Sequence, residues 1–165
     1  MRAGEVMTRD VVTVRPDTSV REAARVMKKL NVGALPVCDG QRLMGMLTDR
    51  DIVVRATADG MQPDTTLVLA VMTEEVCSCF EDDPVEKIER AMAGRQIRRV
   101  PVVDSENRLV GIVALGDLAD DRVPETEKTL RSISHPAEPD RTESQRDGDP
   151  PWPPYGEGTG GPTRG

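Results

Sequence analysis

Aromatic residues, histidine and cysteine are all scarce in this sequence of 165 residues. Phe80 is the only aromatic residue before position 152, so we expect a core of aliphatic side chains and methionine. The one histidine, His135, gives little support to a histidine general base or a catalytic triad. Three cysteines without the spacing of a disulfide framework indicate reduced thiols, which are typical of the cytoplasm.

Long apolar runs and an excess of positive charge are also missing. No apolar stretch approaches the length of a membrane span and no signal peptide opens the chain, so we expect a cytoplasmic protein without membrane association. The net charge of −7 has the wrong sign for a general nucleic-acid surface. A length of 165 residues predicts one domain or two small ones, and 37% hydrophobic residues are enough to form a core.

Most of the chain up to residue 122 consists of two copies of one sequence unit. The copies are displaced by 65 positions up to Asp39 and Asp104, and by 66 afterwards, because the second turn is one residue longer. A register that holds through two apolar segments and a turn indicates a duplicated supersecondary unit, too long for a solenoid repeat. The matches include Val6-Met7-Thr8 with Val71-Met72-Thr73, Val20 with Val85, Met27 with Met92, and Pro36-Val37 with Pro101-Val102.

The first copy predicts the order strand, helix, strand, strand, helix. Ser19 with Glu22 has the spacing of a capping box, and Gly33 is expected to supply a left-handed turn after the helix. Aliphatic residues at helical spacing between them predict one buried helix face. The expected elements are a strand over 11–14, a helix over 19–30, a hairpin of 35–38 and 43–47, and a helix over 48–56.

The second copy predicts the same order. Asp83 is expected as the helix cap and Pro84 as the first helical residue. A single copy has little apolar area, so we expect the two copies to bury their strands against each other. The expected elements are a helical turn before Met72, a strand over 76–80, a helix from 84, a hairpin of 100–103 and 109–113, and a closing helix from Asp117.

The segment from Gly45 to Asp51 carries the strongest functional signal. Thr48 and Asp51 have the spacing of a capping box at a helix N-terminus. Such a terminus suits a phosphate, and a carboxylate beside it can accept hydrogen bonds from a ribose diol. The alternative is that the pair only caps the helix. Because the segment from Gly111 to Leu118 repeats the glycine, the apolar pair and the aspartate, we favour a functional role.

The cysteines and the paired aspartates have structural explanations. Cys77 and Cys79 occupy alternate positions of an expected strand, and two thiols without a nearby histidine give weak support to zinc. Their counterparts in the first copy are valines, so both are interpreted as small core residues, as is Cys38. Asp49 and Asp51 are better explained by the cap and a ribose than by acid–base catalysis.

Together, these motifs resemble the CBS domain, and the pair resembles a Bateman module, over roughly residues 3–122. The chain is similar to small stand-alone actinobacterial CBS proteins, including the hypoxic-response type. The resemblance implies an α/β (α+β) fold in which two CBS repeats pack as a pseudo-twofold pair. The motifs that carry it are Val6-Met7-Thr8, Gly33-Ala34-Leu35-Pro36-Val37, residues 45–51, Arg98-Arg99-Val100-Pro101-Val102-Val103 and residues 111–117.

Four segments are expected along the chain: the first repeat with its linker (1–66), the second repeat (67–123), a C-terminal helix (124–135) and a disordered tail (136–165). The C-terminal helix resembles one that often follows the second repeat in such proteins. In the tail, proline, glycine, serine and charged residues replace apolar ones, so it cannot bury enough surface to offset its ordering entropy.

The resemblance implies a binding module without catalysis of its own. Family members bind AMP, ADP, ATP, S-adenosylmethionine or sometimes NADH between the repeats, and we expect AMP, ADP or ATP here. Asp51 is expected to take the ribose hydroxyls and Thr48 to help hold phosphate. Gly33 and Ala34, with backbone near Arg15, are expected to line the adenine side. Arg98 and Arg99 are expected to reach a phosphate from the second repeat, and Asp49 is also expected at this site.

The second site departs from the family pattern. Asp117 is retained, but Ala114 stands where the threonine belongs. The facing positions of the first repeat, Gly33 and Ala34, carry no charge. We therefore expect one competent site and one weak or empty one.

Three functions remain open at this point. The first is a nucleotide sensor that acts on an unknown regulated protein. The second is a structural module without a ligand, and the third is a metal-responsive or redox-responsive protein that uses its cysteines. Apolar residues beyond what one sheet can cover, such as Val26 and Val53, together with the resemblance, predict a homodimer formed through the helices.

Overall fold

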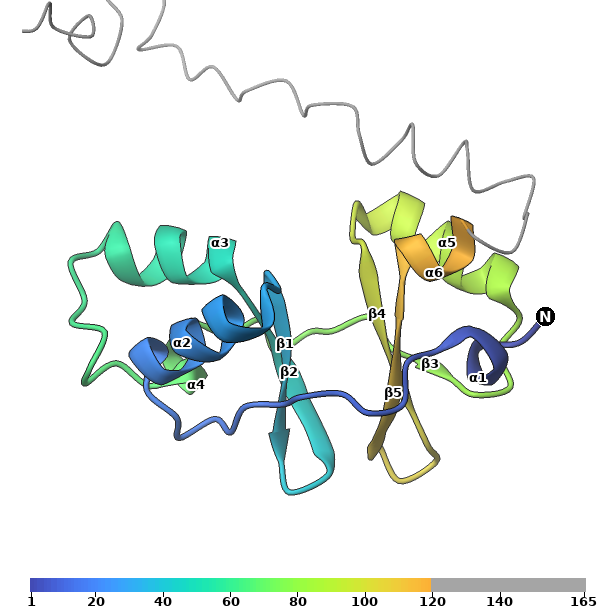
Figure 1. The fold of residues 1–165 in the computed structure, drawn as a ribbon, viewed down its shortest axis with the longest axis horizontal. Helices are drawn as coiled ribbons and strands as arrows, with labels where there is room; N and C mark the ends of the chain where they lie inside the picture. Colours follow the sequence, from blue (N-terminus) through green and yellow to red (C-terminus); the bar gives the residue numbers. More distant parts are fainter. Residues whose placement is uncertain (120–165) are drawn as a thin grey trace, which may run out of the picture. The chain divides into compact units, whose positions relative to one another are not determined.

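The protein, as a computed structural model, is described here for residues 1–119 (Figure 1). The helix and tail predicted for residues 124–165 lie outside this range. Helices and strands are mixed, as expected. In chain order they are α1 (Ala3–Val6), α2 (Val20–Leu30), β1 (Ala34–Asp39), β2 (Arg42–Thr48), α3 (Asp49–Asp51), the π-helix η1 (Ile52–Thr57), α4 (Val68–Val71), β3 (Cys79–Phe80), α5 (Val85–Arg95), β4 (Arg99–Val103), β5 (Leu109–Ala114) and α6 (Leu115–Ala119).

Both predicted hairpins are confirmed. Strands β1 and β2 pair antiparallel, β4 and β5 pair antiparallel, and β3 joins β4 in parallel. The register shifts after Val37 in the first hairpin and after Val102 in the second. The duplication therefore extends to the position of the bulge, where one strand gains an unpaired residue.

The two remaining strands are shorter than predicted. Within residues 11–14, only Val14 pairs, in a single parallel bridge with Val37. Within residues 76–80, only β3 forms. Apolar runs this short predict the place of a strand better than its length, because pairing depends on the neighbouring chain.

The two long helices, α2 and α5, end at equivalent positions of the two repeats, but α2 does not end at the predicted glycine. The Ser19 hydroxyl caps α2 by accepting from the Glu22 amide at 3.1 Å. The left-handed residue after α2 is Asn31, with φ of 52°, and its counterpart after α5 is Gln96, with φ of 54°. The prediction that Gly33 supplies this turn is wrong, because the helix ends two residues earlier, on an asparagine that tolerates this conformation.

Helix α5 begins one residue later than predicted, with Pro84 rather than Asp83 at its N-cap. The Asp83 carboxylate instead accepts hydrogen bonds from the Phe80 amide and from Lys87 Nζ, both at 2.9 Å. These bonds, chiefly that from Phe80, hold the pKa of Asp83 below its ordinary value. The side chain thus fixes the turn in front of the helix.

Each repeat has its own core, and each core includes the segment that precedes the other repeat. Helix α1 lies beside α5, α6 and the three-stranded sheet, whereas α4 lies beside α2 and the first hairpin (Figure 1). The core of the second repeat contains Ala3, Met7, Cys79, Val85, Ile88, Met92, Val100, Val102, Val113, Leu115 and Leu118. The core of the first contains Val14, Val20, Ala23, Met27, Leu35, Val37, Leu47, Ala56, Val68, Val71 and Met72.

A glycine in the second strand of each hairpin allows the segment that precedes the other repeat to pack against that strand. Thr73, beyond α4, makes two backbone hydrogen bonds with Met46 of β2, at 2.8 and 2.9 Å. A Cβ atom on the adjacent Gly45 would lie 2.5 Å from the Thr73 carbonyl oxygen. Gly111 has the same place beside Thr8, so the repeated glycine reflects a close backbone approach.

The repeats also meet at the ends of their hairpins. Cys38 and Leu43 from one hairpin pack with Val103 and Leu109 from the other in a small buried cluster. The expected burial of strand against strand is found there, while the two larger cores stay separate. No helix among residues 1–119 is long and apolar enough to cross a membrane.

Candidate functional site

A cavity of about 650 Å³ is lined by residues of both repeats. This volume is within the range of pockets that hold small-molecule ligands. The first repeat contributes Gly33, Ala34, Met46, Thr48, Asp49 and Arg50. The second repeat and the segment before it contribute Thr73, Glu75, Val76, Cys77, Arg95, Gln96, Ile97, Arg98 and Arg99.

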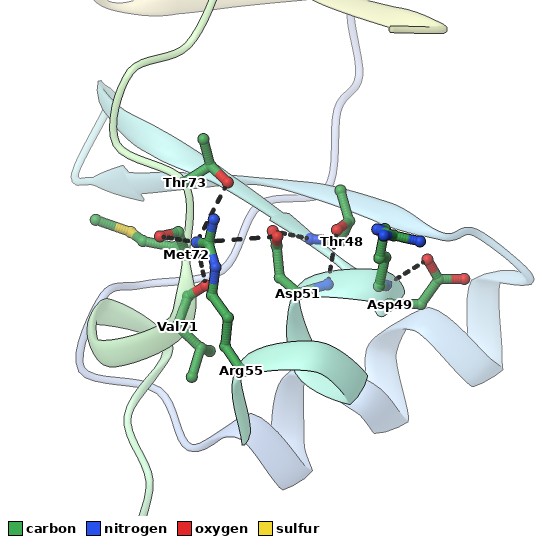
Figure 2. A network of polar contacts seen from close by, with 8 residues as sticks. Thr48, Asp49, Asp51, Arg55, Val71, Met72 and Thr73 are labelled. Carbon is green, nitrogen blue, oxygen red and sulfur yellow. Dashed lines mark hydrogen bonds and ion pairs between the residues drawn. The ribbon is translucent and has the colours of Figure 1, made fainter. Parts of the chain in front are cut away.

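At the edge of this cavity, Thr48 and Asp51 form the predicted capping box (Figure 2). The Asp51 amide donates to Thr48 Oγ1 and the Thr48 amide donates to Asp51 Oδ2, both at 3.0 Å. The helix predicted over residues 48–56 is present as α3 followed by η1. Thr48 lines the cavity, whereas Asp51, with a side chain 12% exposed, lies behind it.

Arg55 joins this capping box to the segment that leads into the second repeat (Figure 2). Its Nη1 donates to the carbonyl oxygens of Val71 and Met72, both at 2.9 Å. The same nitrogen is 3.5 Å from Thr73 Oγ1 and 3.9 Å from Asp51 Oδ1. Since one Nη1 carries two hydrogens, the two carbonyls take the main bonds and Asp51 Oδ1 remains available to another donor.

Gly33 and Asp49 fit against each other at the first-repeat side of the cavity. The Asp49 amide donates to the Gly33 carbonyl at 2.9 Å, and the Asp49 carboxylate accepts from the Arg50 amide at 2.8 Å. A Cβ atom on Gly33 would lie 3.0 Å from Asp49 Oδ2. The missing side chain therefore leaves room for the aspartate, and the counterparts of these two residues are Arg98 and Leu115.

The structure brings most of the predicted site residues together, with two exceptions. Thr48, Asp49, Gly33, Ala34, Arg98 and Arg99 line one cavity. Asp51, whose side chain is mostly buried, is not among the lining residues. Arg15 is not among the lining residues, and its guanidinium lies 3.0 Å from Asp17 and 3.8 Å from Asp39. The segment 75–77, before the second repeat's first strand, also lines the cavity and was not expected there.

Sequence reasoning missed several lining residues, including Arg50 and Arg95. The repeat itself contained a usable signal for one group of them. Residues 96 and 97 are displaced by 65 positions from 31 and 32, which directly precede Gly33, so their proximity to the cavity follows from the duplication. Arg50 lies between Asp49 and Asp51, which were predicted at the site, but its own position in the sequence gives no sign that it lines the cavity.

The cysteines occupy three different environments. Cys79 is buried in the second core, and burial raises the pKa of its thiol to about 11. Cys38 is buried between the hairpins, where burial also raises its thiol pKa. Cys77 is half-buried and lines the cavity, so its assignment to the core is wrong. Because residues 76–78 lie outside β3, the alternation of a strand does not apply to Cys77.

The second motif retains half of the capping box. Asp117 Oδ2 accepts from the Ala114 amide at 2.8 Å, which matches the bond between Asp51 and Thr48. The alanine has no hydroxyl to accept the reciprocal bond, so this end of the motif lacks one polar group.

The duplicated architecture and the paired motifs can be compared with known families. A family model for the CBS domain matches residues 3–56 and 68–123. The chain belongs to the CBS domain family. The two matches are a tandem CBS pair, which is a regulatory module, and they confirm the resemblance drawn from the sequence motifs.

Relatives of similar size share the CBS pair. The CBS domain-containing protein YhcV of Bacillus subtilis is 47% identical over 133 residues, covering 79% of this chain and 94% of YhcV. Hypoxic response protein 1 of Mycobacterium tuberculosis is 38% identical over 118 residues, covering 71% of this chain and 82% of the relative.

Solved CBS structures have the same fold. Hypoxic Response Protein I, crystallised with two coordinated zinc ions, matches with a TM-score of 0.69 at 35% identity, covering 74% of this chain and all of that one. The CBS domain pair of MJ0100, in complex with 5′-methylthioadenosine and S-adenosyl-L-methionine, matches with a TM-score of 0.65 at 30% identity, covering 73% and 94%.

Proposed function

We propose that this CBS pair is a cytoplasmic regulatory sensor that binds one adenosine nucleotide, AMP, ADP or ATP, in the cavity between its repeats. The observation that carries the proposal is a single cavity lined by the Thr48 hydroxyl of one repeat and by Arg98 and Arg99 of the other. Hydroxyl and guanidinium groups are ordinary phosphate ligands. The adenosine ligands of the related MJ0100 pair support a nucleoside-containing ligand for this pair.

Each ligand group has a counterpart in the described residues. The Asp51 carboxylate uses Oδ2 to cap the helix, which leaves Oδ1 to accept a ribose hydroxyl from a ligand seated against Thr48. Ala34, which has a short side chain and lines the cavity, leaves space for the adenine, while the adjacent Gly33 makes room for the Asp49 carboxylate. Arg15 is not among the residues that line this cavity, and its guanidinium is 3.8 Å from Asp39.

The module is proposed to act by binding alone and to pass its state to a regulated protein. A metal-dependent function is not proposed, although a related structure contains zinc. Within residues 1–119, no three histidine, cysteine, aspartate or glutamate side chains are placed to hold a metal ion. The buried Cys38 and Cys79 belong to separate hydrophobic clusters, so they do not form a thiol pair.

A homodimer formed through the helices is part of the proposal. On η1, the side chains of Val53 and Val54 are 59% and 50% exposed. Two adjacent exposed valines on one helix are consistent with a surface that a second copy covers. Light scattering at micromolar concentration should give the mass of a dimer, and replacing both valines with serine should shift it toward the monomer. A monomeric mass for the wild type contradicts this part.

The nucleotide site is tested by thermal unfolding of the full chain with and without ATP, since a ligand that binds only the native state raises Tm. The variants are Asp51→Asn, which keeps an oxygen for the helix cap, and Asp117→Asn as its counterpart in the second repeat. We expect the ATP-induced shift to fall strongly in the first variant and to persist in the second. Equal losses, or no shift in the wild type, would contradict the proposal.

A further inference from the structure

Four arginines line the cavity, and none of them is neutralised by a neighbouring carboxylate. They are Arg50 from the first repeat and Arg95, Arg98 and Arg99 from the second. Among residues 1–119, seven arginines have an acidic partner within 4.0 Å and six do not. Four of those six belong to this one cavity, in a chain with a net charge of −7.

The cavity also contains two carboxylates, Asp49 and Glu75. Asp49 is engaged with the backbone amide of Arg50, at 2.8 Å from Oδ1. Four positive and two negative groups leave two positive charges in excess. An anionic ligand is therefore favoured over a neutral or cationic one.

Four guanidinium groups offer more donors than a single phosphate can fully pair with in bidentate geometry. A terminal phosphate presents three oxygens, and a bidentate arginine contact already takes two of them. Arg98 and Arg99 precede or begin β4, Arg95 ends α5 and Arg50 comes from the other repeat. A chain of phosphates offers acceptors at several places and so can meet groups that come from three separate elements.

We propose that the cavity selects nucleotides with two or more phosphates, so that ATP and ADP bind more tightly than AMP. This inference rests on the proposed nucleotide function. Arg98 and Arg99 serve the phosphate nearest the ribose, and Arg95 with Arg50 serves the phosphates beyond it. S-adenosyl-L-methionine has no phosphate and is cationic at sulfur, so it gains little from these four groups.

Calorimetry on the full chain, at one fixed salt concentration, tests this selection with adenosine, AMP, ADP and ATP. The key variant is Arg95→Gln. The matched control is Arg90→Gln, an exposed arginine on the same helix that lies outside the cavity. In the wild type, ATP should bind at least tenfold more tightly than AMP, a difference of about 1.4 kcal/mol.

Arg95→Gln should reduce the preference for ATP over AMP by about tenfold and leave AMP affinity within twofold. Arg90→Gln should change neither. Tripolyphosphate should displace ATP, because it retains the phosphate chain. Equal affinities for AMP and ATP in the wild type, or equal losses for both in Arg95→Gln, would overturn the selection but leave the nucleotide site intact. If none of the nucleotides binds, the proposed function itself fails.

Discussion

The exchange of segments between the repeats depends on a glycine that can be tested directly. In Gly45→Ala, the new Cβ would lie 2.5 Å from the carbonyl oxygen of Thr73. Carbon and oxygen atoms cannot approach so closely, and the obstacle is backbone rather than a side chain that can rotate. The chain at Thr73 must therefore move away from β2, which breaks its two hydrogen bonds with Met46.

The expected cost of Gly45→Ala follows from these contacts. Two hydrogen bonds at about 0.5–1.5 kcal/mol each, with overpacking of about 1–3 kcal/mol, give a loss of about 2–6 kcal/mol in the free energy of unfolding. A domain of this size loses roughly 3 °C or more of Tm per kcal/mol, so Tm should fall by roughly 10 °C. Differential scanning calorimetry on the unliganded protein measures this shift.

Two other glycines provide a matched series for the same substitution. In Gly111→Ala, the Cβ meets the movable end of the Met7 side chain and lies 3.0 Å from the Thr8 carbonyl oxygen, so the loss should be smaller. Gly94 lies within α5, and nothing would come within 4 Å of its Cβ. Gly94→Ala should therefore raise stability by about 0.5–1 kcal/mol, because alanine is the better helix former. If Gly45→Ala melts at the temperature of the wild type, Thr73 does not lie against Gly45.

Three further predictions concern other parts of the molecule. Asp83→Asn should lower Tm at neutral pH, and the difference in Tm from the wild type should shrink below about pH 4. The reason is that a carboxylate with a lowered pKa contributes stability that is lost as pH falls through that pKa. Calorimetry across pH measures this difference, and a difference that stays constant with pH would argue against it. Iodoacetamide should modify native Cys77 before the buried Cys79, and ATP should slow the reaction at Cys77; mass spectrometry of peptides would reveal equal rates if the cavity assignment were wrong. Arg55→Met should lower the free energy of unfolding by about 1–2 kcal/mol, because it leaves two carbonyls without their donor at a half-exposed position. The control Arg25→Met, which loses only a surface ion pair, should lower it by less than about 0.5 kcal/mol, as measured by urea unfolding.

The duplication made most of the fold predictable from the sequence. Two copies of each element reinforce one another, so the hairpins, the cap at Ser19 and the capping box at Thr48 were all anticipated. Exchange of the segments before the repeats was not, because apolar periodicity indicates which face is buried but not the partner that covers it. A repeated glycine with no turn around it, as at Gly45, was the available sign of a close backbone contact.

The candidate site was predictable only for residues inside the family motifs. Thr48, Gly33 and Arg99 belong to such motifs and line the cavity. Arg95 lies at the end of a helix, and its place at the cavity depends on where α5 stops and how the chain turns into β4. Cys77 was misplaced for a similar reason, since two residues of β3 replaced the five expected.

The central claim is that one nucleotide binds per chain, in the cavity beside Thr48. Isothermal titration of ATP into the full chain measures this stoichiometry directly. The asymmetry between the Thr48–Asp51 pair and the Ala114–Asp117 pair predicts one equivalent bound per chain at saturation. Two equivalents of similar affinity would show that the second motif is a competent site. If titration to millimolar ATP gives neither a heat of binding nor saturation, nucleotide binding is contradicted altogether.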